Sequence, residues 1–207
     1  MKRRDISADS VWREYEKMLA YNDSIQLDDT VRVNENFFIG KQWEGVESNG
    51  LPTPQFNFLK RVTLFTVASI TSDKLKLQCS PLPSGAGDRG LRRAADVINA
   101  EFEALFEHNK LTWLLKEYMR NAAVDGDGAT YTWWDPEADA GDGRRGAVVT
   151  EVVQNTRIGF GNTADRNVQT QPYILIKRRE MTEALRERAR RLGCPDWEAL
   201  KEDTDEQ

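Results

Sequence analysis

The chain has 207 residues, of which 39% are hydrophobic and 30% charged, a composition typical of a folded domain and unlike that of a disordered chain. Its 29 basic and 34 acidic residues leave a net charge of −5, which argues against tight non-specific binding to nucleic acid. The longest apolar run is too short to cross a bilayer, and the charged start lacks the apolar segment of a signal peptide. Because Cys79 and Cys194 lie far apart and imply no disulfide framework, we expect an intracellular protein.

The first third of the chain predicts two helices joined by a turn-rich segment. Ser10 is placed to cap a helix that runs to about Tyr21 and carries apolar residues at helical spacing. Pro52 and Pro54 enforce extended backbone. Asn57 can cap the next element, whose length favours a helix although its β-branched residues leave a strand open.

Between these two elements, residues 34–46 read NENFFIGKQWEGV and combine three aromatics with amides and charges of both signs. We interpret this stretch as a short packed segment. Phe37, Phe38 and Trp43 would pin the first helix to the rest of the fold, while Gly40 and Gly45 allow turns. Its polar residues would face solvent or a neighbouring subunit.

The middle of the chain predicts a short strand at 74–78, a flexible connector at 80–90 and two helices. Leu91, Ala95, Ile98, Phe102 and Leu105 recur at steps of three and four, the pattern of a strongly amphipathic helix. The pair at 108–109 is expected to interrupt it, and a second helix should then end at the glycine at 126.

The last third changes from helical to alternating periodicity. Residues 129–135 and 147–153 predict paired strands, and further strands are expected at 157–160 and 173–178. Thr182 should cap a short Arg-rich helix that Gly193 stops, and one more helix is expected to start at Asp196. Helices followed by an antiparallel β-meander make the predicted fold class α+β.

A literal GxGxxG pattern occurs at Gly85–Gly90, before the amphipathic helix. A dinucleotide site needs these glycines directly after a strand, but Pro81 and Pro83 intervene and Asp88 would lie beside the phosphates. The same pattern recurs at Gly141–Gly146, inside a hairpin loop. We therefore interpret residues 80–90 as a linker.

No other motif predicts a catalytic, cofactor or metal site. The DGDG run from Asp125 fails the calcium-loop pattern because Ala129 and Pro136 occupy ligand positions. His108 is the only histidine, which leaves histidine-based metal sites and nucleophile–histidine catalysis little to work with. The acidic residues in the loop after 134 are expected to form a solvated hairpin tip.

Two further features of the sequence favour interaction surfaces or solvated faces over catalytic sites. Trp133 and Trp134 on one strand should place one indole on each face of the sheet, one in the core and the other under a helix or a partner. The Arg-rich stretch at 177–191 could contact phosphates. Glu183 and Glu187 are spaced to pair with Arg186 and Arg191, so a solvated helix face is favoured.

In their order and spacing, these segments resemble the N-terminal part of the portal proteins of tailed bacteriophages, the head-to-tail connectors through which DNA is packaged. The resemblance runs along most of the chain and rests on several blocks together rather than on one motif. The blocks are YNDSIQLDD (21–29), NENFFIGKQWEGV (34–46), LPTPQFNFLKRV (51–62), MRNAAVDGDGATYTWWD (119–135), IGFGNTADRNVQTQPYILIKRR (158–179) and EALRERARRLG (183–193).

The resemblance implies a portal wing-like α+β fold in which residues 1–207 form the N-terminal wing region, ending before the stem helix and the clip. It implies a homo-oligomeric ring, usually of twelve copies, at one capsid vertex. The large terminase subunit, capsid or scaffold proteins and tail adaptors would attach to this ring. Double-stranded DNA would pass through the bore without being tightly bound. It also implies no catalytic activity, no cofactor and no membrane, with a location first in the host cytoplasm and then in the virion.

Under this interpretation the functional surface is the contact between subunits, where aromatic side chains commonly anchor the binding energy. The candidates are Phe37, Phe38, Trp43, Trp133 and Trp134, although for any single one the core is the favoured location. Two alternatives from other classes remain. One is a phage enzyme that processes nucleotides or DNA with the Gly85–Gly90 loop, and the other is a non-catalytic nucleic-acid-binding module that uses residues 177–191.

Overall fold

A computed structural model describes residues 7–73, 76–85, 87–139, 143, 145–165 and 167–202. Within these residues the chain forms six α-helices and two separate two-stranded antiparallel sheets, which confirms the α+β class. The helices are α1 (Ala8–Ser24), α2 (Leu27–Ile39), α3 (Phe58–Ile70), α4 (Arg89–His108), α5 (Leu111–Asp125) and α6 (Thr182–Arg191). The strands are β1 (Ala129–Asp139), β2 (Arg145–Val153), β3 (Ile158–Phe160) and β4 (Ile174–Ile176).

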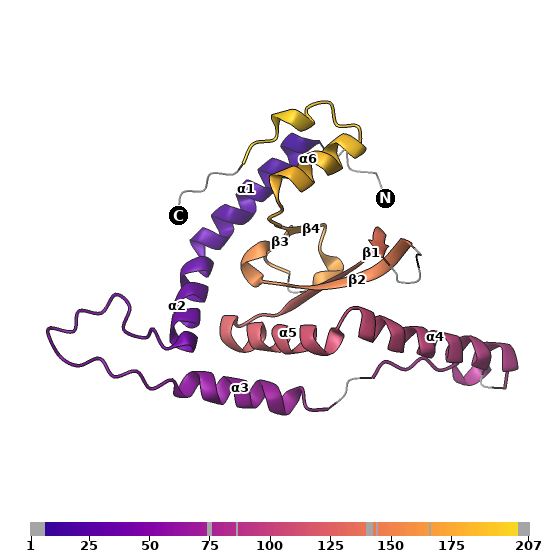
Figure 1. Cartoon of the computed structure of the whole chain (residues 1–207), viewed down its shortest axis with the longest axis horizontal. Coiled ribbons are helices and arrows are strands. Elements are labelled where there is room, and N and C mark those ends of the chain that lie inside the picture. The colour runs from indigo at the N-terminus through magenta and orange to yellow at the C-terminus, as the bar shows by residue number, and fades with distance from the viewer. Residues whose placement is uncertain are drawn as a thin grey trace.

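The elements are arranged around α5 rather than around a large sheet. Helices α3, α5 and α4 lie along the long axis of the molecule, while α1 and α2 rise away from it at a steep angle (Figure 1). Both sheets lie between α1 and α5, and α6 lies beyond them. Helix α5 contacts α2, α3, α4 and β2, so it is the common support of the fold.

The N-terminal helix begins earlier and ends later in the chain than its sequence pattern predicted. Ser7, not Ser10, caps α1: its Oγ accepts a hydrogen bond from the Ser10 amide at 3.3 Å. The helix then runs beyond Tyr21 to Ser24. The predicted and observed ends of the helix thus differ by only a few residues, which is common for helix ends.

Helix α2 was not predicted, and residues 34–39 of the stretch interpreted as a short packed segment form its C-terminal part. The inward-facing residues of α2 are Leu27, Val31, Asn34, Glu35 and Phe38, which follow helical spacing. Two of these five are polar, so the apolar periodicity that identifies an amphipathic helix is broken. The helix ends at a glycine with a φ of +92°, a conformation that favours glycine.

Helix α3 confirms the choice of a helix over a strand. The Asn57 Oδ1 accepts a hydrogen bond from the Lys60 amide at 3.2 Å, as its predicted role as a cap requires.

The strand expected at 74–78 is absent from residues 76–78, and residues 74 and 75 lie outside the described part of the chain. The backbone next to it is paired with a side chain instead of with another strand. The Cys79 amide donates to Asn99 Oδ1 at 2.7 Å, and Asn99 Nδ2 donates to the Cys79 carbonyl at 3.1 Å. This segment therefore packs along α4, and Cys79 is a half-buried free thiol that does not end a strand.

The break between α4 and α5 falls where it was predicted, and it has a structural role. The Asn109 amide group donates to the Val148 carbonyl at 2.8 Å, and its oxygen accepts from the Thr150 amide at 2.9 Å. Both backbone groups belong to β2, so Asn109 covers part of a strand edge that would otherwise be unpaired. Helix α5 ends, as predicted, before Gly126, whose φ is +91°.

The four strands lie where alternation predicted them, but they do not form one meander. β1 and β2 pair from Ala129↔Val153 to Asp135↔Ala147, and β3 and β4 pair from Ile158↔Ile176 to Phe160↔Ile174. A 3₁₀ turn at Asn155–Arg157 separates the two pairs. The Asn155 side chain donates to the Asp125 carbonyl at 3.1 Å, which turns the chain away from the first sheet and toward α5.

The C-terminal elements are close to expectation but differ at their starts. Met181, not Thr182, occupies the cap position of α6, and no side chain there accepts a hydrogen bond from the helix. Asp196 is followed by a single 3₁₀ turn, Trp197–Ala199, in place of the expected helix within the described residues.

The fold leaves an unusually large surface in contact with solvent. The accessible surface is 17093 Å², whereas a compact monomer of this size exposes about 9,800 Å². The buried apolar side chains among the described residues are Met18, Val67, Ala95, Ala147 and Val153. Most large apolar side chains are therefore only partly covered by this chain itself.

Candidate interaction surfaces

Residues 41–57 form an extended arm that projects from the molecule between α2 and α3 (Figure 1). Its two limbs are joined near their base. The Trp43 indole N–H donates to the Pro54 carbonyl at 3.0 Å, and Gln42 Nε2 donates to the same carbonyl at 3.3 Å. Trp43 thus acts as a brace between the limbs of the arm, with 39% of its surface still exposed.

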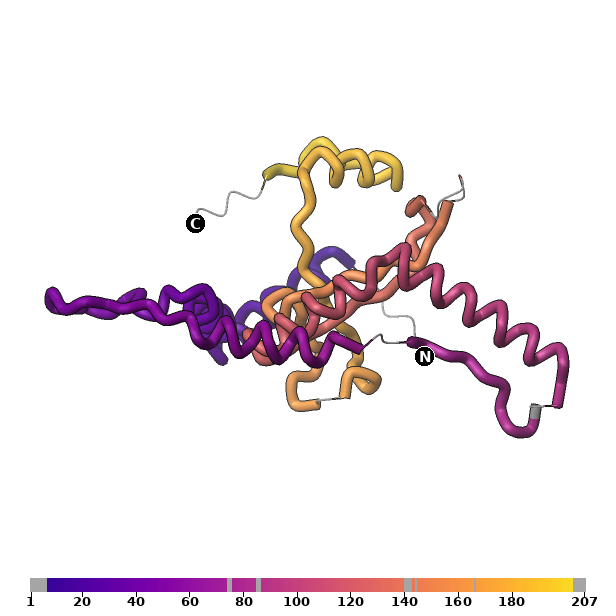
Figure 2. Tube along the Cα trace, turned by 60° about the horizontal axis from the view of Figure 1, so that its bottom comes forward, coloured from indigo at the N-terminus to yellow at the C-terminus, as the bar shows by residue number. Residues whose placement is uncertain are grey.

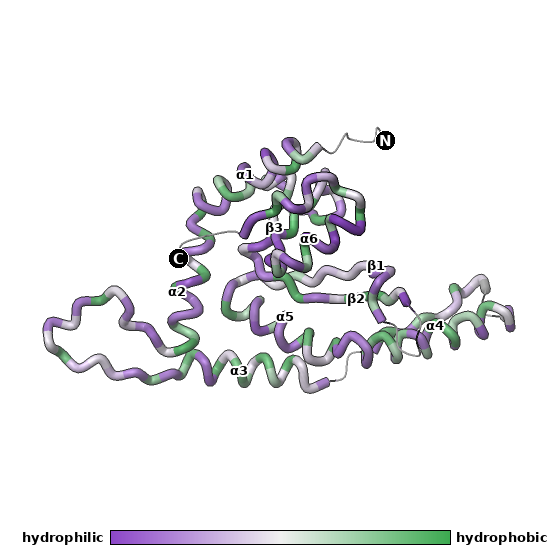
Figure 3. Tube along the Cα trace, turned by 45° about the horizontal axis from the view of Figure 1, so that its top comes forward, coloured by the Kyte–Doolittle hydropathy of each residue, from purple (hydrophilic) through white to green (hydrophobic). Residues whose placement is uncertain are grey.

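Beyond this brace the arm carries apolar side chains that the described residues leave largely uncovered. Leu51 is 71% exposed and Val46 54%. Phe56 lies on the α3 side of the brace, where it stacks on Phe58 with ring centroids 6.1 Å apart and is still 66% exposed. A turn at 48–51, in which the Leu51 amide donates to the Ser48 carbonyl at 2.8 Å, forms the bend of the arm. Figure 3 shows hydrophobic positions along this arm with no other element of the chain beside its outer part. The outer arm therefore exposes apolar side chains that no other described element of this chain covers.

Phe37 and Phe38 lie on α2 and have different surroundings. Phe38 is half-buried, with the Arg120 guanidinium 4.9 Å and the Lys60 Nζ 5.7 Å from its ring centroid. Cations at these distances are attracted by an aromatic ring. Because Lys60 is on α3 and Arg120 on α5, Phe38 ties three helices together. Phe37 points elsewhere and is 44% exposed.

Close to the same three-helix junction lies a carboxyl group whose pKa is raised, that of Asp125. Arg120 forms an ion pair with Glu35 of α2. Burial raises the pKa of Asp125; the nearby Glu35 carboxylate raises it further and Arg120 lowers it. The Oδ1 atoms of Asp125 and Asn155 are buried without a hydrogen-bond partner in the described structure. This polar junction stabilises the crossing of α2 and α5 at some cost in desolvation.

Trp133 and Trp134 point to opposite faces of the first sheet, as alternation along a strand predicts. Trp133 is half-buried: it stacks on Tyr131 with centroids 5.0 Å apart, and the Arg178 guanidinium lies 4.5 Å from its centroid. Trp134 is 62% exposed on the other face. Neither indole is therefore a fully buried core residue of this chain, and Trp134 adds to the uncovered apolar surface.

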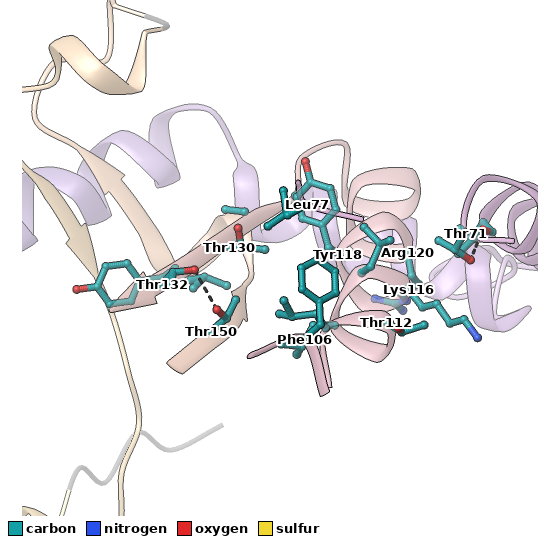
Figure 4. A pocket seen from close by; sticks show the side chains of 18 of the residues that line it. Thr71, Leu77, Phe106, Thr112, Lys116, Tyr118, Arg120, Thr130, Thr132 and Thr150 are labelled. Atoms are coloured by element: carbon teal, nitrogen blue, oxygen red, sulfur yellow. Dashed lines mark hydrogen bonds between the residues drawn. The ribbon is translucent and has the colours of Figure 1, made fainter. Parts of the chain in front are cut away.

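An open groove of about 1380 Å³ runs between helices α3, α4 and α5 and the two sheets. Figure 4 shows Phe106 and Tyr118 on its helical side and Thr130, Thr132 and Thr150 on its strand side. The Thr132 and Thr150 hydroxyls form a hydrogen bond of 3.0 Å across the hairpin. Apolar side chains line most of the rest, namely Leu64, Phe102, Leu115, Ile158, Ile174 and Ile176.

In the described part of the chain, no group of three or more His, Cys, Asp or Glu side chains could hold a metal ion. Residues 76–82 form no strand, and Asp88 caps α4 by accepting from the Gly90 amide at 2.7 Å. The glycine pattern at Gly85–Gly90, whose Ala86 lies outside the described residues, therefore lacks the strand that a dinucleotide site requires. In the second match, at 141–146, residues 141, 142 and 144 lie outside the described residues.

The Arg-rich C-terminal stretch is held by the chain itself, but not by the pairs that its spacing predicted. Arg186 donates to the Leu200 carbonyl at 2.6 Å. Arg188 pairs with Glu180 at 2.9 Å, and Arg191 pairs with Glu137 of β1 at 3.1 Å. These guanidinium groups thus fix α6 to its neighbours instead of forming an isolated basic patch.

The placement of the five candidate aromatics could be read from the sequence only in part. Period-two alternation correctly placed Trp133 and Trp134 on opposite faces of the sheet, but neither fills the core position expected for one of them, since Trp133 is half-buried and Trp134 is 62% exposed. The brace between Trp43 and Pro54 spans eleven residues of irregular chain, for which no periodic pattern exists. The role of Phe38 depends on Arg120, which lies far along the chain on α5.

Comparisons of the chain with protein-family models, with curated proteins and with solved structures found no match. Among the helices of the described residues, none has the length and apolar character needed to cross a membrane.

Proposed function

We propose that the chain is a structural component of a phage portal vertex, forming part of the wing of a ring through which DNA is packaged and ejected. In this role it has no catalytic activity and needs no cofactor. Terminase and tail adaptors attach to the assembled ring, and capsid or scaffold proteins surround it. The proposal rests on the sequence blocks that resemble portal proteins and on the physical character of the surface.

The observation that carries the proposal is the accessible surface of 17093 Å², which exceeds that of a compact monomer by roughly 7,000 Å². A standard interface buries about 800 Å² on each partner, and obligate interfaces bury considerably more. The uncovered surface is thus of the size that several permanent contacts would use. An assembly component accounts for it better than an enzyme that acts as a monomer.

The position of the resembling blocks agrees with this role. The blocks at 34–46 and 51–62 form one continuous unit, made of the end of α2, the arm and the start of α3. This unit contains Phe37, Phe38 and Trp43 and projects beyond the body of the fold. A segment built to hold an arm in place is expected in a subunit that must reach its neighbour.

The charge distribution fits a ring through which DNA passes better than a surface that binds DNA tightly. The net charge is −5, and Arg186, Arg188 and Arg191 already have partners within the chain. Tight duplex binding instead requires clustered cations that are available to release counterions from phosphates.

Negative-stain electron microscopy of the purified chain tests this proposal. We expect ring-shaped or arc-shaped particles at micromolar concentration, and a population made only of single chains at every concentration would contradict it. A duplex-binding titration at several salt concentrations is the companion measurement. Weak binding at physiological salt is expected, whereas tight and steeply salt-dependent binding would favour a nucleic-acid-binding module instead.

A further inference from the structure

The bend of the arm is formed by an Asn-Gly pair whose backbone geometry follows from its sequence. The Leu51 amide donates to the Ser48 carbonyl at 2.8 Å, so Asn49 and Gly50 are the two central residues of the turn. Both have a positive φ, +47° for Asn49 and +81° for Gly50. Turns of this kind prefer Asn-Gly, because glycine lacks a Cβ and asparagine tolerates left-handed backbone better than most residues. No second Asn-Gly pair occurs in the 207 residues.

The same dipeptide is chemically labile, because the amide nitrogen of a following residue can attack the side-chain carbonyl of asparagine. A side chain on the following residue hinders this attack, and glycine has none. At Gly50 a Cβ atom would have nothing within 4 Å, so no neighbouring group crowds the approach either. Asparagine is for this reason among the residues that limit the chemical lifetime of a protein at high temperature.

Neither of the two reacting groups is held by a contact. Asn49 and Gly50 are both exposed. Among the described residues, which include all of 41–57, no group forms a hydrogen bond with the Asn49 side chain or with the Gly50 amide. Figures 1 and 2 show the bend at the far end of the arm, with no helix or strand beside it. The rotation that brings the two groups together therefore opens only the hydrogen bond between Ser48 and Leu51, and exposed loop tips open at little cost in free energy.

Two other exposed asparagines, Asn162 and Asn167, have the opposite surroundings. The Oδ1 of Asn162 accepts a hydrogen bond from the Ala164 amide at 3.2 Å, and that of Asn167 accepts from the Gln169 amide at 3.0 Å. The residue that follows each of them is β-branched. Both side chains are thus held away from the next backbone nitrogen, and that nitrogen is hindered. They are internal controls for Asn49 in the same molecule.

We propose that Asn49 is a site of spontaneous deamidation in the folded chain. The Gly50 backbone nitrogen, after losing its proton to a base in solvent, attacks Cγ of Asn49. A C–N bond forms, the bond from Cγ to the side-chain nitrogen breaks, and that nitrogen takes up a proton and leaves as ammonia. Water then adds to one of the two carbonyls of the resulting succinimide and opens the ring, which gives aspartate or isoaspartate. Because the nucleophile is the deprotonated amide, the rate rises with pH.

The reaction changes the arm at its bend. Both products carry a carboxylate in place of a neutral amide, next to Leu51, which is 71% exposed. Isoaspartate also adds a methylene group to the main chain within the turn. One consequence rests on the proposed function, namely that aged chains assemble more weakly, because a charge then lies on a surface that contact between copies would bury.

Peptide mapping by mass spectrometry tests the proposal on the folded chain, incubated at mildly alkaline pH and physiological temperature. A synthetic peptide of residues 46–53, incubated in the same way, gives the rate without the fold. We expect Asn49 of the folded chain to convert at no less than a tenth of the peptide's rate, and at least tenfold faster than Asn162 and Asn167. Slower conversion than the first limit, or conversion no faster than that of the two internal controls, would overturn the proposal.

Two variants at the bend assign the reaction to the proposed atoms. Asn49→Gln should convert at least tenfold more slowly, because attack on the longer side chain must close a larger ring. Ser48→Ala keeps the Asn-Gly pair and the backbone hydrogen bond of the turn, so it should convert like the original chain. Circular dichroism checks that both variants are folded. Conversion of segment 46–53 in Asn49→Gln at the original rate would show that the reaction lies elsewhere.

Sedimentation velocity of fresh and aged chains separates this proposal from the proposed function. If Asn49 does not convert, the deamidation site is wrong while the proposed function stands. If Asn49 converts and aged chains associate as strongly as fresh ones, the deamidation site stands, and the bend of the arm takes no part in contact between copies.

Discussion

The body of the molecule around α5 and the arm at 41–57 are held in different ways. The body is fixed by hydrogen bonds between residues that are distant in sequence, such as Asn109 to β2 and Asn155 to the end of α5. The arm is braced at its base by Trp43 and Gln42, and its apolar side chains beyond the brace are exposed. A chain that only had to fold would gain little from such an arm.

This difference separates two kinds of residue. Substitutions in the body should lower the free energy of unfolding and leave the capacity to assemble in the molecules that remain folded. Substitutions in the outer arm should weaken assembly and leave the free energy of unfolding nearly unchanged. Because assembly itself stabilises the folded state, unfolding must be compared at a concentration where the chain is dissociated.

The largest effect on stability is expected for Asn109→Leu. This change removes the side-chain hydrogen bonds to Val148 and Thr150 of β2 and leaves those backbone groups unpaired beside an apolar side chain. At about 1 kcal/mol for each lost hydrogen bond, we expect the free energy of unfolding to fall by about 2–3 kcal/mol in urea denaturation. The matched arm variant Gln55→Leu should change it by less than about 0.5 kcal/mol. Equal effects at the two positions would break the distinction between body and arm.

A smaller loss is expected for Gly128→Ala, at the start of β1. A Cβ atom at this position would lie 2.9 Å from the Tyr118 backbone oxygen and 2.8 Å from its ring, and a backbone atom cannot move aside as a side-chain end can. Overpacking of this kind costs about 1–3 kcal/mol. Gly87→Ala is the control, since a Cβ there has nothing within 4 Å. Unchanged stability in Gly128→Ala would show that α5 and β1 are less closely packed than described.

The buried carboxyl of the body should make stability depend on pH. Because the pKa of Asp125 is raised in the folded state, that state keeps a proton that the unfolded chain has lost between the ordinary pKa of 3.8 and the raised value. The stability contributed by this group is therefore lost as the pH rises through that interval. As the pH rises through this interval, we expect the Asp125→Asn variant to gain stability relative to the original chain.

Urea titrations at a series of pH values measure this difference. Asp127→Asn, at an exposed carboxylate in the same turn, controls for the loss of a negative charge. The raised pKa of Asp125 would be contradicted if the difference in free energy of unfolding between Asp125→Asn and the original chain did not change with pH. It would also be contradicted if this difference came to favour the original chain as the pH rises.

The smallest effect on unfolding is expected in the arm itself. Leu51 is 71% exposed, so Leu51→Asp should change the free energy of unfolding of the dissociated chain by less than about 0.5 kcal/mol. The same variant should associate at least tenfold more weakly, because it places a charge on an apolar surface that the proposed contact between copies would bury. A variant that is strongly destabilised when dissociated would mean that Leu51 packs within its own chain.

The sequence alone was sufficient for elements whose apolar residues follow one period. Helix α4, the break at His108, helix α5 and the four strands were all predicted, because burial on one face imposes the period of the element. Helix α2 was missed because Asn34 and Glu35 occupy inward positions, where Glu35 pairs with Arg120 of α5. The strand at 74–78 was predicted from local composition, but at Cys79 a side chain of α4 replaces a strand partner.

The interaction surfaces were predictable only as a list of aromatic residues. Whether Trp43 is core or surface depends on the Pro54 carbonyl. Such contacts between irregular segments leave no periodic trace in the sequence.

Sedimentation velocity over a concentration series tests the central claim most directly, because it measures assembly without assuming which surface the arm meets. The account predicts that the original chain associates as its concentration rises, and that Leu51→Asp, at a side chain that is 71% exposed, associates at least tenfold more weakly while remaining folded. Single chains at every concentration, or equal association of the original chain and the variant, would contradict it.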